Sequence, residues 1–519
     1  MALLRFTATV GGYTMVSRVV GFARDILIAA MVGAGPVGDA FFIAFKIPNL
    51  LRRLFAEGAF NLSFVPLFAR RLEEDGAEAA REFANSALAV LLWSLVGLVG
   101  LAELTLPWLM YGLAPGFAGD PEKFALAVEL TRITFPYILF ISLVSLMGGV
   151  LNSLHRFAAP AATPILLNLC LIGALLGLTD SLETPGHALA VGVSGAGVVQ
   201  LVWLYLACRR AGVSLGLRRP RLTPAVRRLF VIMAPVALGA GVAQISVLVD
   251  MIFASQIDGA VSWLYYADRV NQLPLGVIGV ALGTALLPML TRQLRSGNAE
   301  AARENQNRAI EMACLLALPA AVALIVIAGP IITVLFERGA FDAQASGAAA
   351  WALMAYAGGL PAFVLIKVLV PAFFAREEPR TPVRIAIICV LVNVALNGAL
   401  IWPLGHVGVA LATSISGWLN VALLIRALRA RGYLAVDERL AARIGPIMLS
   451  GAAMGAALWA LAWALDDVLA SGQGLRIVAL LALIVAGLAV YGCVGRLAGA
   501  WRLDELRRLM RRSPDVGDA

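Results

Sequence analysis

The sequence predicts an all-α, polytopic membrane protein of about fourteen transmembrane helices: two parallel six-helix repeats forming N and C lobes, plus two extra C-terminal helices. Two observations predict this class. First, 61% of the 519 residues are hydrophobic and only 14% are charged, whereas soluble domains carry about a quarter charged residues. Second, apolar runs of about twenty residues recur along the whole chain, and each is long enough to cross roughly 30 Å of hydrocarbon as a helix.

Taken in chain order, the apolar runs define the expected spans. A run such as 87–101 lacks the alternation of membrane barrel strands, so helices are expected. The spans lie near residues 8–33, 36–68, 84–111, 124–154, 161–179, 187–208, 229–257, 260–291, 309–336, 345–375, 383–403, 407–428, 444–465 and 475–499.

Arginine collects in alternate connections: after the second, fourth, sixth, eighth, tenth and twelfth expected spans, and in the C-terminal tail. The other connections are short and neutral or acidic, such as 33–38 and 180–183. The positive-inside rule therefore places both termini in the cytoplasm. The net charge of +9 follows largely from this topology. Nucleic acid is not an expected partner, because the arginines are dispersed without interleaved aromatic residues.

An internal repeat divides the spans. Residues 65–72 (VPLFARRL) align with 287–294 (LPMLTRQL), and at the same offset of 222 residues, from Pro66 to Pro288, 78–82 match 300–304. The repeat unit holds about six spans, and an even number gives both halves the same orientation, with a pathway between them. The expected domains are an N-lobe (1–222), a C-lobe (223–440), extra helices (441–500) and a cytoplasmic tail (501–519).

Charged residues inside the spans are the candidate site, because an arginine at bilayer depth costs about 3 kcal/mol even on mild scales. Several arginines around one cavity would repel one another unless an anion lay between them, and guanidinium groups suit phosphate. A phosphate-bearing substrate is therefore predicted. The first, second and eighth spans carry Ser17, Arg18, Arg24, Asp25, Asp39, Lys46, Arg52, Arg53, Glu57, Ser262, Asp268 and Arg269.

The alternative is that these charges neutralise one another inside the bundle. Arg24 would pair with Asp25 or Asp39, and Arg269 with Asp268. The i,i+4 spacing of Arg53 and Glu57 also allows an ion pair on one helix face.

Cysteine and histidine argue against a metal enzyme. The five cysteines stand singly, with no CxxC pair, and are expected to pack in the core. The histidines, His155, His187 and His406, lie in separate loops without metal-ligand spacing.

Long stretches of the chain resemble a known family: 17–25 (SRVVGFARD), 39–60 (DAFFIAFKIPNLLRRLFAEGAF) and 261–269 (VSWLYYADR). They are similar to the MurJ (MviN) family of lipid II flippases, within the multidrug/oligosaccharidyl-lipid/polysaccharide exporter superfamily, and the likeness runs from residue 1 to the fourteenth span. The resemblance implies alternating-access transport of undecaprenyl-pyrophosphate-linked disaccharide pentapeptide to the outer leaflet of the bacterial inner membrane, for peptidoglycan synthesis. No covalent bond would change. Membrane lipids and cell-wall synthesis enzymes are the other partners it suggests.

The resemblance also assigns roles. It implies that the last two helices hold the polyprenyl tail. Among the polar and charged residues found inside the spans, Ser17, Asp25, Arg53, Glu57 and Asp268 are expected to support the cavity. By the same resemblance, a cavity for the pyrophosphate and sugars is lined by Arg18, Arg24, Asp39, Arg52 and Arg269, with Ser262 nearby.

A cation site is a further implication of the resemblance, although some relatives carry aspartate where this chain has Asn397. The alternative is a polar cluster in the core whose members satisfy one another's hydrogen bonds. No cofactor is expected, and either Na⁺ or the membrane potential acting on the cavity arginines would drive transport. The similar positions here are Asp250, Asn393, Asn397, Val409 and Thr413.

Three other functions remain open from the sequence. A related exporter, either a flippase for other polyprenyl-linked oligosaccharides or a drug/cation antiporter, would share the architecture, but cationic drugs favour carboxylates over arginines. A polyprenyl-phosphate transferase would need acidic metal-binding or general-base residues near a membrane face. A scaffold for cell-wall enzymes would not need buried arginines.

Overall fold

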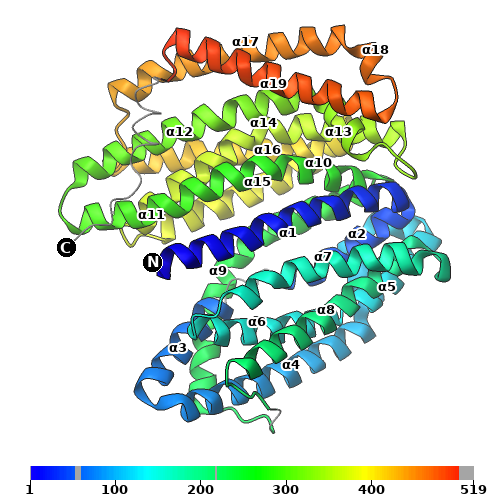
Figure 1. Cartoon of the computed structure of the whole chain (residues 1–519), viewed down its shortest axis with the longest axis vertical. Coiled ribbons are helices and arrows are strands. Elements are labelled where there is room, and N and C mark those ends of the chain that lie inside the picture. Colours follow the sequence, from blue (N-terminus) through cyan, green and yellow to red (C-terminus); the bar gives the residue numbers. More distant parts are fainter. Residues whose placement is uncertain (1, 53–59, 217–218, 502–519) are drawn as a thin grey trace. The chain divides into compact units, whose positions relative to one another are not determined.

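The computed structural model describes residues 2–52, 60–216 and 219–501, which are helical almost throughout (Figure 1). Within these ranges the extended pairing is a single bridge between Arg338 and Phe341. The chain divides into two compact units, one formed by 1–263 with 336–345 and the other by 264–335 with 346–519.

The first unit is built around α7 and α8, which pack on each other; α1 packs on α7, α6 on α8, and α2 on α5. Helix α9, which the sequence repeat assigns to the C-lobe, packs against α3 and α4 here. The helices are α1 (Ala2–Val32), α2 (Pro36–Leu51), α3 (Phe60–Glu74), α4 (Gly76–Leu113), α5 (Pro121–Thr134), α6 (Tyr137–Ser153), α7 (Ala158–Leu178), α8 (Pro185–Arg210), α9 (Pro224–Ala254) and the start of α10 (Ala260–Pro274).

The second unit contains the rest of α10, a π-helical turn (Leu275–Gly279) and the remaining helices. Helix α15 packs along α16, and α17 packs on both α19 and α12 (Figure 1). The helices are α11 (Val280–Arg295), α12 (Ala299–Val326), α13 (Ala328–Phe336), α14 (Ala343–Phe374), α15 (Arg380–Leu404), α16 (His406–Ala430), α17 (Glu438–Ala464), α18 (Asp466–Leu469) and α19 (Gln473–Ala498).

Helix starts follow from local sequence. The side chains of Thr184, Thr223 and Asp437 each accept a hydrogen bond from the backbone N–H three residues on, at the starts of α8, α9 and α17. Proline follows both threonines at the first helical position, where its missing N–H costs nothing. These caps fix where the long apolar segments begin.

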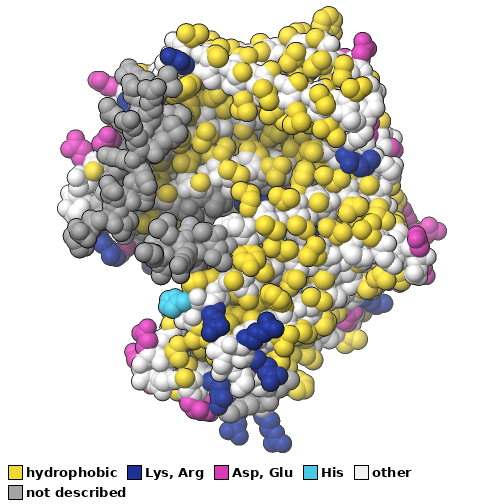
Figure 2. All heavy atoms as spheres, in the orientation of Figure 1, with side chains coloured by type: hydrophobic (Ala, Val, Ile, Leu, Met, Phe, Trp, Pro, Cys, Tyr) yellow, Lys and Arg dark blue, Asp and Glu magenta, His cyan; other side chains and the backbone are white. Residues whose placement is uncertain are grey.

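Eleven helical segments in the described residues are long and apolar enough to cross a membrane, and they coincide with eleven of the fourteen expected spans. The other three expected spans fall on α1, on α2 with α3, and on α9. Hydrophobic side chains cover most of the face in Figure 2, and tryptophans such as Trp402 and Trp463 are 83% and 78% exposed. So much apolar surface requires a lipid solvent, and the chain is an all-helical multi-pass membrane protein.

The C-terminal helices are tied to α12 by buried charge. Glu311 on α12 is 6% exposed and forms ion pairs with Arg308, Arg439 and Arg443, two of which belong to α17. On α19, the Tyr491 hydroxyl donates to the Leu315 carbonyl at 2.7 Å. Helices α17 and α19 are therefore anchored to the second unit by specific polar contacts as well as by apolar packing.

Candidate functional site

A buried carboxylate lies at the start of α2. The Asp39 side chain is fully buried and accepts four hydrogen bonds. Lys123 Nζ and the Gly259 N–H each donate to Oδ2 at 2.8 Å. The Ser262 N–H and hydroxyl donate to Oδ1 at 3.0 and 2.7 Å. Because Gly259 and Ser262 are at the start of α10, Asp39 acts as an N-cap supplied from another helix, where the helix dipole favours negative charge.

Lys123 balances this carboxylate. Its ammonium lies 2.9 Å from Asp258 as well as 2.8 Å from Asp39, and it sits 4.3 Å from the centroid of the Phe117 ring. Its side chain is only 1% exposed, so the pair is shielded from water. Asp39, Lys123, Asp258, Gly259 and Ser262 are called the Asp39 network below.

Backbone segments approach closely around this network. The amide of Gly116 donates to the Ser255 hydroxyl at 3.3 Å, and a Cβ on Gly116 would lie 2.1 Å from the Ser255 carbonyl oxygen. At Gly33, where φ is +73°, a Cβ would lie 2.3 Å from the Ala340 carbonyl oxygen. Glycine at both positions permits contacts that any side chain would block.

Arg24 is buried between α1 and α7. Its guanidinium donates to Asp25 Oδ1 at 2.6 and 3.0 Å and to Asn168 Oδ1 at 2.8 Å. The Asn168 amide in turn donates to the Ser17 carbonyl at 3.1 Å. The pairing of Arg24 with Asp25 matches the neutralised alternative, while the other charged neighbour on α1, Arg18, is exposed.

Other predicted cavity residues have contacts of their own. Arg52, just after α2, donates to Asn49 Oδ1 at 2.8 and 3.1 Å, and Arg53 and Glu57 lie outside the described residues. In the second unit, the Arg269 guanidinium lies 5.1 Å from the Tyr265 ring centroid and donates to its hydroxyl at 3.1 Å. Asp268 accepts a hydrogen bond from Gln272.

Four of the five expected cation-site residues come together on α15 and α16. The Asn397 amide donates to Asn393 Oδ1 at 3.2 Å, and the Asn393 amide approaches the Thr413 hydroxyl at 3.5 Å. The Thr413 hydroxyl donates to the Val409 carbonyl at 3.2 Å. Asp250, on α9, belongs to the other unit. The cluster is oxygen-rich, as a hard cation prefers.

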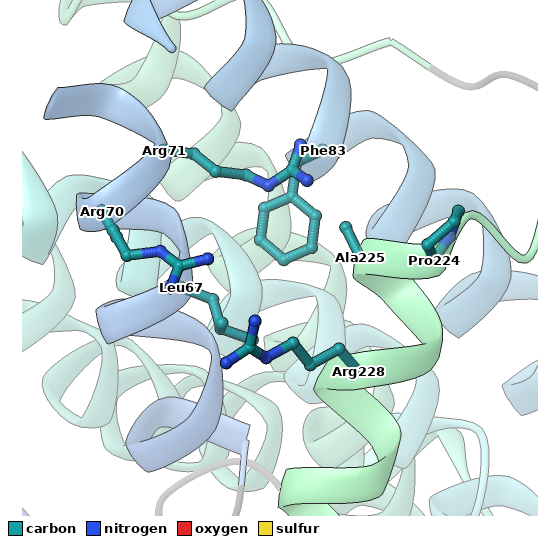
Figure 3. Close-up of a pocket in the computed structure, with 7 residues that line it drawn as sticks. All are labelled: Leu67, Arg70, Arg71, Phe83, Pro224, Ala225 and Arg228. Carbon is teal, nitrogen blue, oxygen red and sulfur yellow. The ribbon is translucent and has the colours of Figure 1, made fainter. Parts of the chain in front are cut away.

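A basic pocket of about 170 Å³ lies among α3, α4 and the first turn of α9 (Figure 3). In Figure 3, Arg70 and Arg228 extend toward one another, and Arg71 lies over the Phe83 ring, 5.3 Å from its centroid. No lining residue is acidic. These arginines follow the second and sixth expected spans, so the connections predicted to be cytoplasmic meet here and concentrate positive charge.

Two residues of these clusters, Lys123 and Asn168, were not predicted as site residues from the sequence. Lys123 is one of only three lysines among 41 basic residues, and that rarity was the available signal. Asn168 is a lone amide in the apolar run 161–179, which suggests a polar partner inside the bundle. Neither sequence feature identifies the residue that Lys123 or Asn168 contacts.

Comparison with known proteins identifies the family. A family model described as lipid II flippase MurJ matches residues 28–480. A probable lipid II flippase MurJ of Rhizobium tropici is 45% identical over 519 residues, covering 99% of this chain and 97% of the relative. Lipid II flippase MurJ of Burkholderia cenocepacia is 39% identical over 439 residues, covering 83% and 85%.

Solved structures agree with this result. Lipid II flippase MurJ in an inward closed conformation has a TM-score of 0.78 and 26% identity, covering 97% of this chain and 99% of that one. An inward-facing multidrug resistance transporter of the MATE family has a TM-score of 0.65 at 17% identity, covering 80% and 94%, which shows a shared fold alone. The chain belongs to the MurJ family of lipid II flippases and is therefore a transporter rather than an enzyme.

Proposed function

We propose that the chain flips lipid II from the cytoplasmic to the outer leaflet by alternating access, and that the Asp39 network forms part of an outer gate. The Asp39 network carries this proposal. It ties the starts of α2 and α5 to the turn between α9 and α10, and all three segments border connections that arginine distribution predicts to lie outside. Opening this side would require Asp39 to leave Gly259 and Ser262, and Lys123 to leave Asp258.

The energetics suit a gate. Hydrogen bonds to charged groups contribute about 1.5–3 kcal/mol each, so several of them hold the outer side closed without making it permanent. Substrate opens it only by binding the open state more tightly than the closed one. Lipid II headgroup contacts made during passage are the proposed source of that difference.

The headgroup is proposed to meet Arg18, Arg24, Arg52 and Arg269, whose guanidinium groups suit pyrophosphate oxygens. The contacts of Arg24 with Asp25 and Asn168 support a fixed orientation for that guanidinium. In this structure Asp39 and Ser262 are hydrogen-bonded to each other. We therefore propose that they contact the substrate only in a different conformational state. The family resemblance remains the main support for the whole set.

Headgroup and tail must travel separately, because sugars and phosphates are costly in hydrocarbon and a polyprenyl chain is costly in water. We assign the tail to the apolar surface of α17 and α19. Exposed apolar side chains such as Trp459, Trp463 and Leu488 support this assignment. The anchoring of α17 to α12 keeps that surface beside the bundle.

The proposed architecture is six plus six plus two helices in the bacterial inner membrane, with both termini cytoplasmic. Two driving forces fit. Sodium would bind Asn393, Asn397, Val409 and Thr413 together with Asp250, or the membrane potential would act on the cavity arginines at about 2.3 kcal/mol per charge per 100 mV. Lipid II transport measured in vesicles that have only a sodium gradient, or only a membrane potential, would distinguish these two driving forces.

The test replaces Arg18, Arg24, Arg52 and Arg269 singly with Ala in cells depleted of their own lipid II flippase. We expect wild type to restore lipid II in the outer leaflet, and each variant to lose most of that activity at equal protein abundance. The exposed Arg295→Ala variant is the matched control and should behave as wild type. Full activity in all four variants would show that these arginines are structural.

A further inference from the structure

A histidine with an unused ring nitrogen lies at the start of α8. His187 is 6% exposed, and its Nδ1 is 2.9 Å from the Thr184 hydroxyl. Its Nε2 is buried and has no hydrogen-bond partner. When Nδ1–H donates to Thr184, the Nε2 lone pair is free to accept a ligand.

Two carboxylates lie near this imidazole ring. Glu129 of α5 places Oε1 at 3.5 Å from His187 Nε2, and ligand atoms of Glu129, Glu183 and His187 all lie within 4.8 Å of one another. Among the ion pairs of the described residues, Glu129 has His187 alone and Glu183 has none. Two carboxylates this close repel each other, and a cation bound between them would remove that repulsion.

We propose that Glu129, Glu183 and His187 bind one divalent transition-metal ion, with Zn²⁺ as the best fit. Two ligand atoms at about 2.0–2.1 Å from a tetrahedral zinc are separated by about 3.4 Å, close to the observed 3.5 Å between Nε2 and Oε1. Glu183 is exposed, and its carboxylate lies within 4.8 Å of the ligand atoms of the other two residues. An imidazole ligand argues against Ca²⁺ and Mg²⁺, which take oxygen ligands.

The metal would act as a clamp within the first unit. It would join α5 to the connection before α8, a connection that the arginine pattern predicts to face outside, and water would fill the fourth position. Sequence spacing gave no hint, because Glu129 is on a different helix from His187. This site is independent of the flippase mechanism proposed above.

The test uses the full-length chain, purified in detergent with a tag that lacks histidine and dialysed against Zn²⁺. We expect about one zinc per chain by elemental analysis and a higher melting temperature with Zn²⁺ than with a chelator. His187→Gln, Glu129→Gln and Glu183→Gln should each weaken zinc affinity by about tenfold or more. The two glutamate variants change exposed side chains, so they test the site even if the histidine variant folds poorly.

Two controls keep the result specific. Glu122→Gln changes another exposed carboxylate of α5, and His155→Gln removes an exposed histidine elsewhere; neither should alter zinc binding. The proposal is overturned if wild type takes up no stoichiometric zinc at about 100 µM, or if the three site variants bind zinc as wild type does. It is equally overturned if Zn²⁺ leaves the melting temperature unchanged while Glu129→Gln lowers it without metal, because His187 would then be a protonated partner of Glu129.

Discussion

Asp39 receives its hydrogen bonds from residues 84 to 223 positions further along the chain. A buried carboxylate with this many donors stabilises the fold strongly, because removing its charge leaves Lys123 with one exposed partner, Asp258.

We therefore expect Asp39→Asn to lower the free energy of unfolding by about 3 kcal/mol, the usual cost of breaking a buried ion pair. The amide also places donor hydrogens against the donors of Lys123 or Ser262. Thermal unfolding of the purified protein in detergent measures this. Asp75→Asn is the matched control, since Asp75 is exposed and its side chain caps nothing. A variant as stable as wild type would remove Asp39 from the gate.

The sequence predicted part of this site. Asp39 and Ser262 were both predicted as site residues. Their direct hydrogen bond could not be predicted from the sequence, because it depends on two segments 223 residues apart meeting in space. Arg24 and Asp25 are adjacent, so their pairing could be stated as an alternative in advance. The contribution of Asn168 could not, since it arises only from the packing of α7 on α1.

At the scale of helices, hydropathy was sufficient to find spans but not their interruptions. The expected span 124–154 is two helices, because the chain breaks at Phe135 and Pro136 between α5 and α6, where proline offers no N–H. The expected span 309–336 likewise divides at Ile327. Window averages of hydropathy do not register a local break that keeps the segment apolar.

The attachment of α17 to α12 gives a prediction at this scale. Glu311→Gln removes a buried carboxylate that pairs with Arg308, Arg439 and Arg443, and Arg443 is only 9% exposed. We expect a loss of about 3 kcal/mol in unfolding free energy. Glu300→Gln, an exposed change in the first turn of α12, should cost far less. Equal melting temperatures for the two variants would contradict the anchor.

At the scale of the whole molecule, the arginine-rich connections predict the topology. In a cysteine-free background, Ser181→Cys should react with an impermeant maleimide from outside the inner membrane, whereas Ser296→Cys should react only after lysis. Both positions are exposed, so labelling reports sidedness rather than burial. Labelling of Ser296→Cys from outside would invert the assignment of both termini.

The external cap on α10 has a thermodynamic consequence for the transport cycle. If Asp39 leaves in the proposed outer opening, the first amides of α10 lose their acceptor, and unpaired backbone donors are not tolerated in a dry interior. Water must then reach that helix end, so opening the outer side and hydrating it are a single event. Solutes that lower water activity would therefore shift the molecule toward its closed form, whatever ion or potential powers the cycle.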